Sequence, residues 1–122
     1  MHILIIEDDS IMTLLLTRML KNFSYEVSSA KDGREGVNLI NQYSYDLVIT
    51  DMMLPFISGP QIVSHIKNLT GKKTPVILLS SMPLSVLEMG ADNIKADSYL
   101  SKPVHPDELK MTIEALTEVE CC

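Results

Sequence analysis

Acidic side chains directly follow two of the most apolar segments of the sequence. The acidic triplet at 7–9 comes after the aliphatic run at 3–6, and Asp51 comes after the apolar run at 45–50. Adjacent carboxylates repel one another, and crowding raises the pKa of at least one of them unless a cation or a basic side chain lies among them. The triplet is therefore either a solvated strand end or half of a site.

A hydroxyl and an ammonium group occupy similar positions later in the chain. Ser80 ends the apolar run at 75–80, and Lys102 follows the short segment at 97–101. Mg²⁺ typically takes one or two carboxylates together with waters and phosphate oxygens, and an aspartate can carry a phosphoryl group covalently. Lys102 and Ser80 would supply positive charge and a donor to the transition state. Together these are the groups needed to move a phosphoryl group onto a carboxylate.

Strands and helices are predicted to alternate along the chain and to position these groups. The predicted strands are 3–6, 25–30, 45–50, 75–80 and 97–101. The first, third and fourth lack polar alternation, which is typical of strands buried on both faces.

Helices are predicted after each of these strands. Asp9 or Ser10 can cap the first helix, Asp32 the second and Ser58 the third. The apolar stripe of the first helix consists of Met12, Leu15, Leu16, Met19, Leu20 and Phe23. The second and third helices carry Val37, Leu39 and Ile40, and Ile62, Val63, Ile66 and Leu69. A fourth helix is predicted at about 84–95, and the last begins near Pro106 and runs through Leu109, Ile113, Leu116 and Val119.

The alternation predicts an α/β fold with a single doubly wound five-stranded parallel sheet, (βα)5. Parallel strands need right-handed crossovers, which place helices on both faces of the sheet. The strand order is either the flavodoxin-like 2-1-3-4-5 or that of a Rossmann-like half. Ligands bind such sheets at the carboxyl ends of the strands, where the winding reverses; in the flavodoxin-like order this point lies between strands 1 and 3. Both acidic strand ends flank that point.

Length and charge limit the remaining possibilities. The 122 residues fit one domain, 1–122, with a core of about 1–119 and a short C-terminal tail. A net charge of -6 argues against direct binding to nucleic acid.

The aliphatic runs are too short to cross a membrane, and no secretory signal precedes the first strand. Cys121 and Cys122 form neither a disulfide framework nor a metal-ligand spacing, which favours a reducing compartment such as the cytoplasm.

Four segments in succession resemble the signature segments of a bacterial response-regulator receiver domain, the phosphoacceptor module of two-component and phosphorelay signalling. They are "ILIIEDD", "DLVITDMMLPFISG", "VILLSS" and "YLSKPV", and the match covers essentially the whole chain. The resemblance implies that Asp51 is the phosphoacceptor. It also implies Mg²⁺, for which Mn²⁺ could substitute, held by Glu7, Asp8, Asp51 and the main-chain carbonyl of Met53.

The same resemblance implies roles for residues of the later segments. Ser80 and Tyr99 would act as the switch, Lys102 as the conserved cation, and the Lys102–Pro103 peptide bond would be cis. A histidine kinase or histidine phosphotransfer protein would donate the phosphoryl group, and an unknown downstream effector would read the result. Ile11 and Leu14 add apolar surface to the first helix, either for docking of the kinase or for packing under a neighbouring loop. The chain would be no enzyme beyond catalysing its own phosphorylation and dephosphorylation.

Departures from the family pattern and three other classes complete the sequence-based prediction. Ser80 stands where threonine is commoner, and Val104 replaces a frequent aromatic residue, which weakens any expectation of dimers like those of winged-helix regulators.

A phosphatase of the haloacid-dehalogenase kind would need a second acid two positions after Asp51, where Met53 stands. A flavodoxin would need a hydroxyl- and glycine-rich phosphate loop after the first strand. A receiver fold that serves only as a binding module stays open, and so does the choice between a stand-alone regulator and a receiver from a longer protein.

Overall fold

The described chain forms one parallel β-sheet of five strands. The computed structural model describes residues 1–69, 73–81 and 96–117. The strands are β1 (His2–Ile6), β2 (Glu26–Ala30), β3 (Leu47–Asp51), β4 (Val76–Ser80) and β5 (Ser98–Ser101). They pair in the order β2-β1-β3-β4-β5, and every pairing is parallel. The flavodoxin-like order predicted from the sequence is therefore confirmed, and a Rossmann-like half is excluded.

Three of the four described helices begin directly after capping residues that the sequence predicted. They are α1 (Ser10–Asn22), α2 (Gly33–Gln42), α3 (Gly59–Lys67) and α5 (Pro106–Thr117). Asp9, Asp32 and Ser58 each accept a hydrogen bond from a main-chain N–H group in the first turn of α1, α2 and α3. The predicted helix at 84–95 lies outside the described residues, as do Val119, Cys121 and Cys122.

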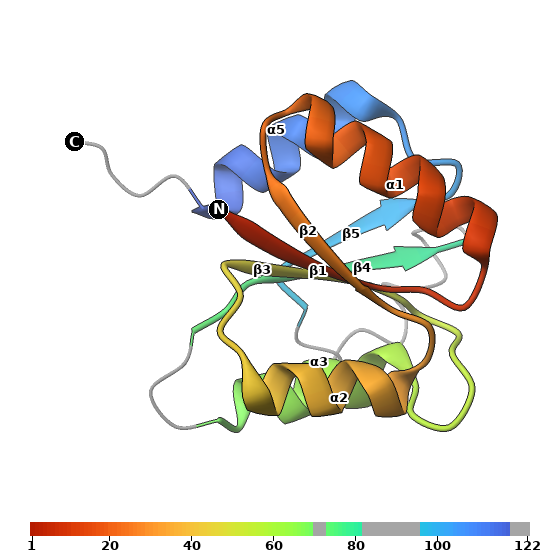
Figure 1. The fold of residues 1–122 in the computed structure, drawn as a ribbon, viewed down its shortest axis with the longest axis vertical. Helices are drawn as coiled ribbons and strands as arrows, with labels where there is room; N and C mark the ends of the chain where they lie inside the picture. Colours follow the sequence, from red (N-terminus) through yellow and green to blue (C-terminus); the bar gives the residue numbers. More distant parts are fainter. Residues whose placement is uncertain (70–72, 82–95, 118–122) are drawn as a thin grey trace.

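The helices cover the sheet on both faces, with α1 and α5 on one and α2 and α3 on the other (Figure 1). Side chains alternate along β1, so that Ile3 and Ile5 pack toward α1 and α5 while Leu4 and Ile6 pack toward α2 and α3. Each face therefore has its own apolar core, and β1, β3 and β4 are buried between the two cores. This double burial fixes the sheet that carries the acidic strand ends.

One part of the helical prediction is wrong. Leu15 was expected in the buried stripe of α1, but 47% of its surface is exposed. The buried residues of α1 are Leu16 and Leu20, and Met12, Met19 and Phe23 pack partly against them. Leu15 instead lies on the outer side with Ile11 and Leu14. Leu69 also differs slightly from expectation, because it lies beyond the end of α3 yet still packs against the same core.

The described helices do not meet the requirements for crossing a membrane. None of them combines the length and the apolar character that a bilayer span requires.

Candidate functional site

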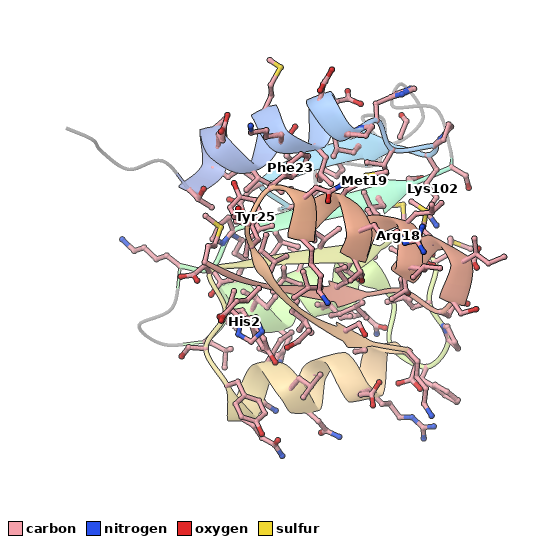
Figure 2. All side chains as sticks on the ribbon, turned by 45° about the horizontal axis from the view of Figure 1, so that its top comes forward. His2, Arg18, Met19, Phe23, Tyr25 and Lys102 are labelled. Carbon is pink, nitrogen blue, oxygen red and sulfur yellow. The ribbon has the colours of Figure 1, made fainter. Side chains whose placement is uncertain are left out.

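The carboxyl ends of four neighbouring strands meet at one edge of the sheet. β1 leads into Glu7 and Asp8, β3 ends at Asp51, β4 ends at Ser80, and Lys102 follows β5. The strand pairing keeps these ends nearly level, since Asp51 lies opposite Leu79 and Ser80 lies opposite Ser101. Lys102 lies at the opposite end of the sheet from His2, the first residue of β1 (Figure 2).

Lys102 joins the two buried acids. Its Nζ lies 3.2 Å from Oε1 of Glu7 and 3.2 Å from Oδ1 of Asp51. The main-chain N–H of Lys102 donates to the carbonyl of Ser80 at 2.8 Å, which fixes the lysine beside the end of β4. The Lys102–Pro103 peptide bond is cis, as the resemblance implied. One ammonium group therefore contacts carboxylates from β1 and β3 at the same time.

Burial and mutual repulsion act on the charges of this cluster. Burial raises the pKa of Glu7 first, and the neighbouring negative charge of Asp51 raises it further, while Asp9 and Lys102 lower it only in part. Burial alone would lower the pKa of Lys102, but Asp51 and Glu7 together outweigh that effect and raise it. The surroundings thus favour the charged form of Lys102 and disfavour the charged form of Glu7.

Glu7, Asp8 and Asp51 form a group of oxygens suited to a metal ion. One carboxylate oxygen of each lies within 4.8 Å of the other two. Oε2 of Glu7 accepts a hydrogen bond from the main-chain N–H of Asp9, but Oε1 accepts none of good geometry from the described residues, although Lys102 Nζ is 3.2 Å away. A donor set made only of oxygens with a buried, unsatisfied carboxylate oxygen fits a hard divalent cation.

Asp9 lies outside this group, as the sequence predicted. Its Oδ1 accepts the main-chain N–H of Ile11 at 3.0 Å and so caps α1. The third acid of the triplet therefore has a structural role at the helix start.

Met53 lies on the loop between β3 and α3, two positions after Asp51. The loop is held at both ends, because the N–H of Met52 donates to the carbonyl of Leu79 at 2.8 Å and the N–H of Gly59 donates to the carbonyl of Met52 at 3.1 Å. The side chain of Met53 is exposed. The role of its main-chain carbonyl stays a prediction.

Ser80 and Tyr99 lie on adjacent strands. Ser80 is buried at the end of β4, close to the acidic cluster in the sheet. Tyr99 on β5 pairs in register with Leu78, is half-buried and packs against the core under α2 and α3, where burial raises the pKa of its hydroxyl group. The switch role of the two residues stays a prediction.

The expected docking residues are exposed on α1. The exposed fractions are 69% for Ile11 and 52% for Leu14, so no loop within the described residues covers either side chain. With Leu15 they form a continuous apolar surface, which we call the α1 patch, directly after the acidic strand end.

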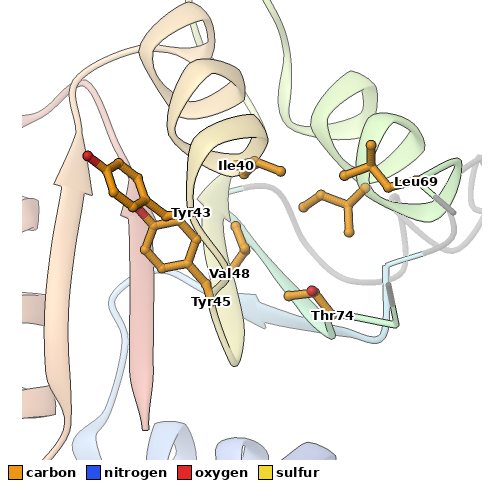
Figure 3. A pocket seen from close by; sticks show the side chains of 7 residues that line it. Ile40, Tyr43, Tyr45, Val48, Leu69 and Thr74 are labelled. Carbon is orange, nitrogen blue, oxygen red and sulfur yellow. The ribbon is translucent and has the colours of Figure 1, made fainter. Parts of the chain in front are cut away.

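Two hollows differ in their relation to the site. One of about 220 Å³ is lined by residues that include Glu7, Asp8, Ser10, Thr13 and Ser29. Figure 3 shows the other, at the amino end of β3, with Tyr43 and Tyr45 on one side and Leu69 and Thr74 on the other. The volume of about 10 Å³ in this second hollow is little more than one water molecule needs. Of these two hollows, the one beside the acids is therefore the one with room for a ligand.

The sequence missed one contact near the site, between the guanidinium group of Arg34 on α2 and the ring of Phe56 on the β3–α3 loop. The only signal of this contact in the sequence was Phe56 itself, a bulky residue directly after Pro55. Glycine or asparagine is usual at this place in a turn.

Comparison with known proteins agrees with this geometry. The sequence model of the response regulator receiver domain matches residues 3–114. The chain is 36% identical over 116 residues to the cell cycle response regulator CtrA of Brucella ovis, covering 95% of this chain and 50% of that protein. The chain therefore spans about half the length of the curated relatives it matches.

Solved structures give the same match. The receiver domain of a sensor histidine kinase from Pseudomonas aeruginosa, solved with magnesium in its active-site cleft, has a TM-score of 0.86 and 25% identity, with 95% of this chain and 96% of that chain covered. The response regulator TrrA of Thermotoga maritima, solved in complex with Mg²⁺ and BeF, has a TM-score of 0.83 and 30% identity, with 94% of this chain and 97% of that chain covered.

Proposed function

The chain belongs to the response-regulator receiver domain family, the phosphoacceptor modules of two-component signalling, and we propose that Asp51 is its phosphoacceptor. Residues 1–122 then act as one receiver domain with a core of about 1–119. The observation that carries this proposal is the cluster of three carboxylates at the carboxyl edge of the sheet, two of which contact one lysine. Asp51 is the acid that ends the central strand β3 and contacts Lys102 directly.

The metal is Mg²⁺, and Mn²⁺ can substitute for it. Glu7, Asp8, Asp51 and the carbonyl of Met53 would hold the ion, with Glu7 acting directly or through water. When bound, Mg²⁺ supplies positive charge to the phosphoryl oxygens and to the attacking carboxylate. The magnesium in the two structural neighbours and the oxygen-only donor set support this assignment.

The residues of the chain position the transfer. An Oδ atom of Asp51 attacks the phosphorus of a phosphohistidine, so that an O–P bond forms while the N–P bond breaks and the imidazole leaves with the electron pair. Lys102 holds Asp51 in place and stabilises negative charge on the phosphoryl oxygens. The hydroxyl of Ser80 donates to the same group after transfer. The chain thus catalyses its own phosphorylation and dephosphorylation and acts on no other substrate.

Phosphorylation shifts an equilibrium between two conformations. Ser80 moves toward the phosphoryl group, and Tyr99 reorients on the neighbouring strand. A downstream effector binds the conformation that this change favours. The half-buried position of Tyr99, with both the core and the surface within reach, supports this role.

The phosphodonor is a histidine kinase or a histidine phosphotransfer protein in the cytoplasm. Ile11 and Leu14 of the α1 patch would contact it, because they are exposed and apolar and lie next to the acidic strand end. The net charge of -6 disfavours direct contact with nucleic acid.

Intact-mass measurement after reaction with a small phosphodonor tests the proposed function. The protein is incubated with phosphoramidate and Mg²⁺, in parallel with an EDTA sample, the Asp51→Asn variant and the control variant Asp9→Asn. We expect a gain of one phosphoryl group in the unsubstituted protein and in Asp9→Asn, and no gain in the other two samples. A gain that persists in Asp51→Asn would contradict the assignment, and no gain in any sample would favour a receiver fold that serves only as a binding module.

A further inference from the structure

The β3–α3 loop, residues 52–58, contains a strained turn beside the proposed metal site. The N–H of Ile57 donates to the carbonyl of Pro55 at 2.8 Å, and Phe56 between them has a φ of 72°. A hydrogen bond across three residues with a central φ near this value is the rare, strained form of the γ-turn. A bulky L-residue in this region of φ is unfavourable, so the surroundings must stabilise it.

Core packing does not hold the side chain of Phe56. Its exposed fraction is 66%, and the side chain of Met53 earlier in the same loop is exposed too. Leu54 and Ile57 pack partly against the core under α2 and α3. The exposed part of the loop therefore depends on contacts outside the core.

The first turn of α2 supplies such contacts. The guanidinium carbon of Arg34 lies 3.7 Å from the centre of the Phe56 ring, which is a close cation–π contact. A Cβ at the neighbouring Gly33 would lie 2.2 Å from the carbonyl oxygen of Ile57, so only glycine allows the loop to lie directly on the helix. The first turn of α2 thus touches Phe56 and Ile57, two successive residues of the γ-turn itself.

We propose that Arg34 is a positioning residue that holds the γ-turn at Phe56 and so keeps the main chain of Met53 in place for Mg²⁺. This inference rests on the proposed function, in which the Met53 carbonyl is a ligand. Only Leu54 and Pro55 separate Met53 from Phe56 in the chain, and the ring of Pro55 fixes one of the main-chain torsions between them. Loss of the contact at Phe56 would therefore reach Met53 along a short stretch of main chain.

Titration calorimetry with Mg²⁺ on the full chain tests the inference. The variants are Arg34→Ala, Phe56→Leu and the double variant, and thermal unfolding of each in EDTA shows that it is folded. We expect each single variant to weaken Mg²⁺ binding about threefold to tenfold. The double variant should bind Mg²⁺ no more weakly than the single variant with the lower Mg²⁺ affinity, because each single substitution already removes the same contact.

Two matched variants separate positioning from general effects. Lys110→Ala also removes a cation from an aromatic ring, 5.6 Å from the centre of Phe23, and changes the net charge equally, but it lies between α5 and α1. It should leave Mg²⁺ affinity unchanged. In a Phe56→Gly background, where glycine adopts the turn without strain, Arg34→Ala should have no further effect.

The possible results distinguish this inference from the proposed function. If the unsubstituted chain binds Mg²⁺ and Arg34→Ala binds it equally well, the positioning role is wrong while the proposed function stands. If the unsubstituted chain binds no Mg²⁺, both are wrong. Equal weakening in Arg34→Ala and Lys110→Ala would show an effect of net charge and would also overturn the inference.

Discussion

At the scale of single residues, the site carries more negative charge than its own cation balances. Three carboxylates converge at the strand ends, and Lys102 is the only cation within ion-pair distance of them among the described residues. The ammonium group contacts Glu7 and Asp51, whereas Asp8 is exposed and makes no such contact. Because negative charge remains unbalanced, the folded site without metal is electrostatically unfavourable. A divalent cation would balance this charge.

The raised pKa of Glu7 predicts how stability without metal depends on pH. The unfolded chain has the ordinary value of 4.5, and burial followed by repulsion from Asp51 places the folded value above it. Between these two values the folded state binds more protons than the unfolded state, so the free energy of unfolding falls as pH rises through this window. Urea unfolding in EDTA at steps of pH should show this fall in the parent and not in Glu7→Gln. Parallel pH profiles for the two proteins would contradict it.

The sequence predicted the acids, Ser80 and Lys102 because each follows a strand, and parallel strands deliver their ends to one edge. It could not predict the contact of Arg34 with Phe56, because α2 and the β3–α3 loop are far apart in the chain and neither residue belongs to a periodic pattern. Only the position of α2 against that loop, which depends on packing across the sheet, reveals it.

At the scale of elements, the start of α3 depends on a close approach to β3. A Cβ at Gly59 would lie 2.4 Å from the carbonyl oxygen of Asp51 and 2.8 Å from the Cα of Met52. The capping box of Ser58 and Gln61 fixes the helix start at this place. The start of α3 and the end of β3 are therefore in direct main-chain contact.

Gly59→Ala should lower the free energy of unfolding by about 2 kcal/mol, because main-chain atoms must move to admit the methyl group. Gly36→Ala should cost less, since its Cβ would meet the end of the Ile6 side chain, 2.6 Å away, and alanine favours the helix. Urea unfolding of both variants measures the difference. Equal losses, or a larger loss in Gly36→Ala, would contradict this ranking.

The sequence predicted the buried side of α1 correctly except for Leu15. Apolar residues occupy more than half of its circumference, so periodicity allows several neighbouring stripes. Packing against α5 and the sheet buries Leu16 and Leu20 and leaves Leu15 outside with Ile11 and Leu14. Placing Leu15 correctly requires knowledge of the neighbouring helix, which the sequence of α1 does not contain.

The α1 patch predicts a selective defect in transfer from a protein donor. The test uses a histidine kinase that phosphorylates the parent. Leu14→Glu should slow this reaction about tenfold, because the apolar contact with the kinase is lost. It should leave the reaction with phosphoramidate unchanged. Met111→Glu is the matched control, because Met111 is 70% exposed on α5. Equal slowing with both donors, or no slowing with the kinase, would contradict docking at this patch.

At the scale of the whole molecule, two apolar cores cover the two faces of the sheet, while the acidic group lies at the carboxyl ends of the strands. The sequence predicted this architecture because uninterrupted apolar strands and amphipathic helices alternate regularly, which leaves few possible topologies. Because β1 and β3 are buried on both faces, we expect the acids at their ends to stay close together when the metal is absent. We therefore expect metal binding to stabilise the folded state.

Asp8→Asn should reveal this coupling. Without metal it should raise the midpoint of thermal unfolding, because it removes one of the three clustered negative charges and no ion pair. Mg²⁺ at 100 times its dissociation constant should stabilise the parent by about 3 kcal/mol and the variant much less. Thermal unfolding with Mg²⁺ or EDTA measures both effects, with Asp9→Asn as the control. A variant that is less stable than the parent in EDTA would contradict the electrostatic account.

The central claim is that Asp51 carries the phosphoryl group, and chemical mapping of the modified residue tests it most directly. The protein is phosphorylated with phosphoramidate and Mg²⁺ and then treated with borohydride, which reduces an aspartyl phosphate to homoserine. Mass spectrometry of the proteolytic peptides locates the reduced residue. We predict homoserine at position 51 and nowhere else. Homoserine at position 8 or 9, or a phosphate that withstands borohydride on Ser80, would contradict the account.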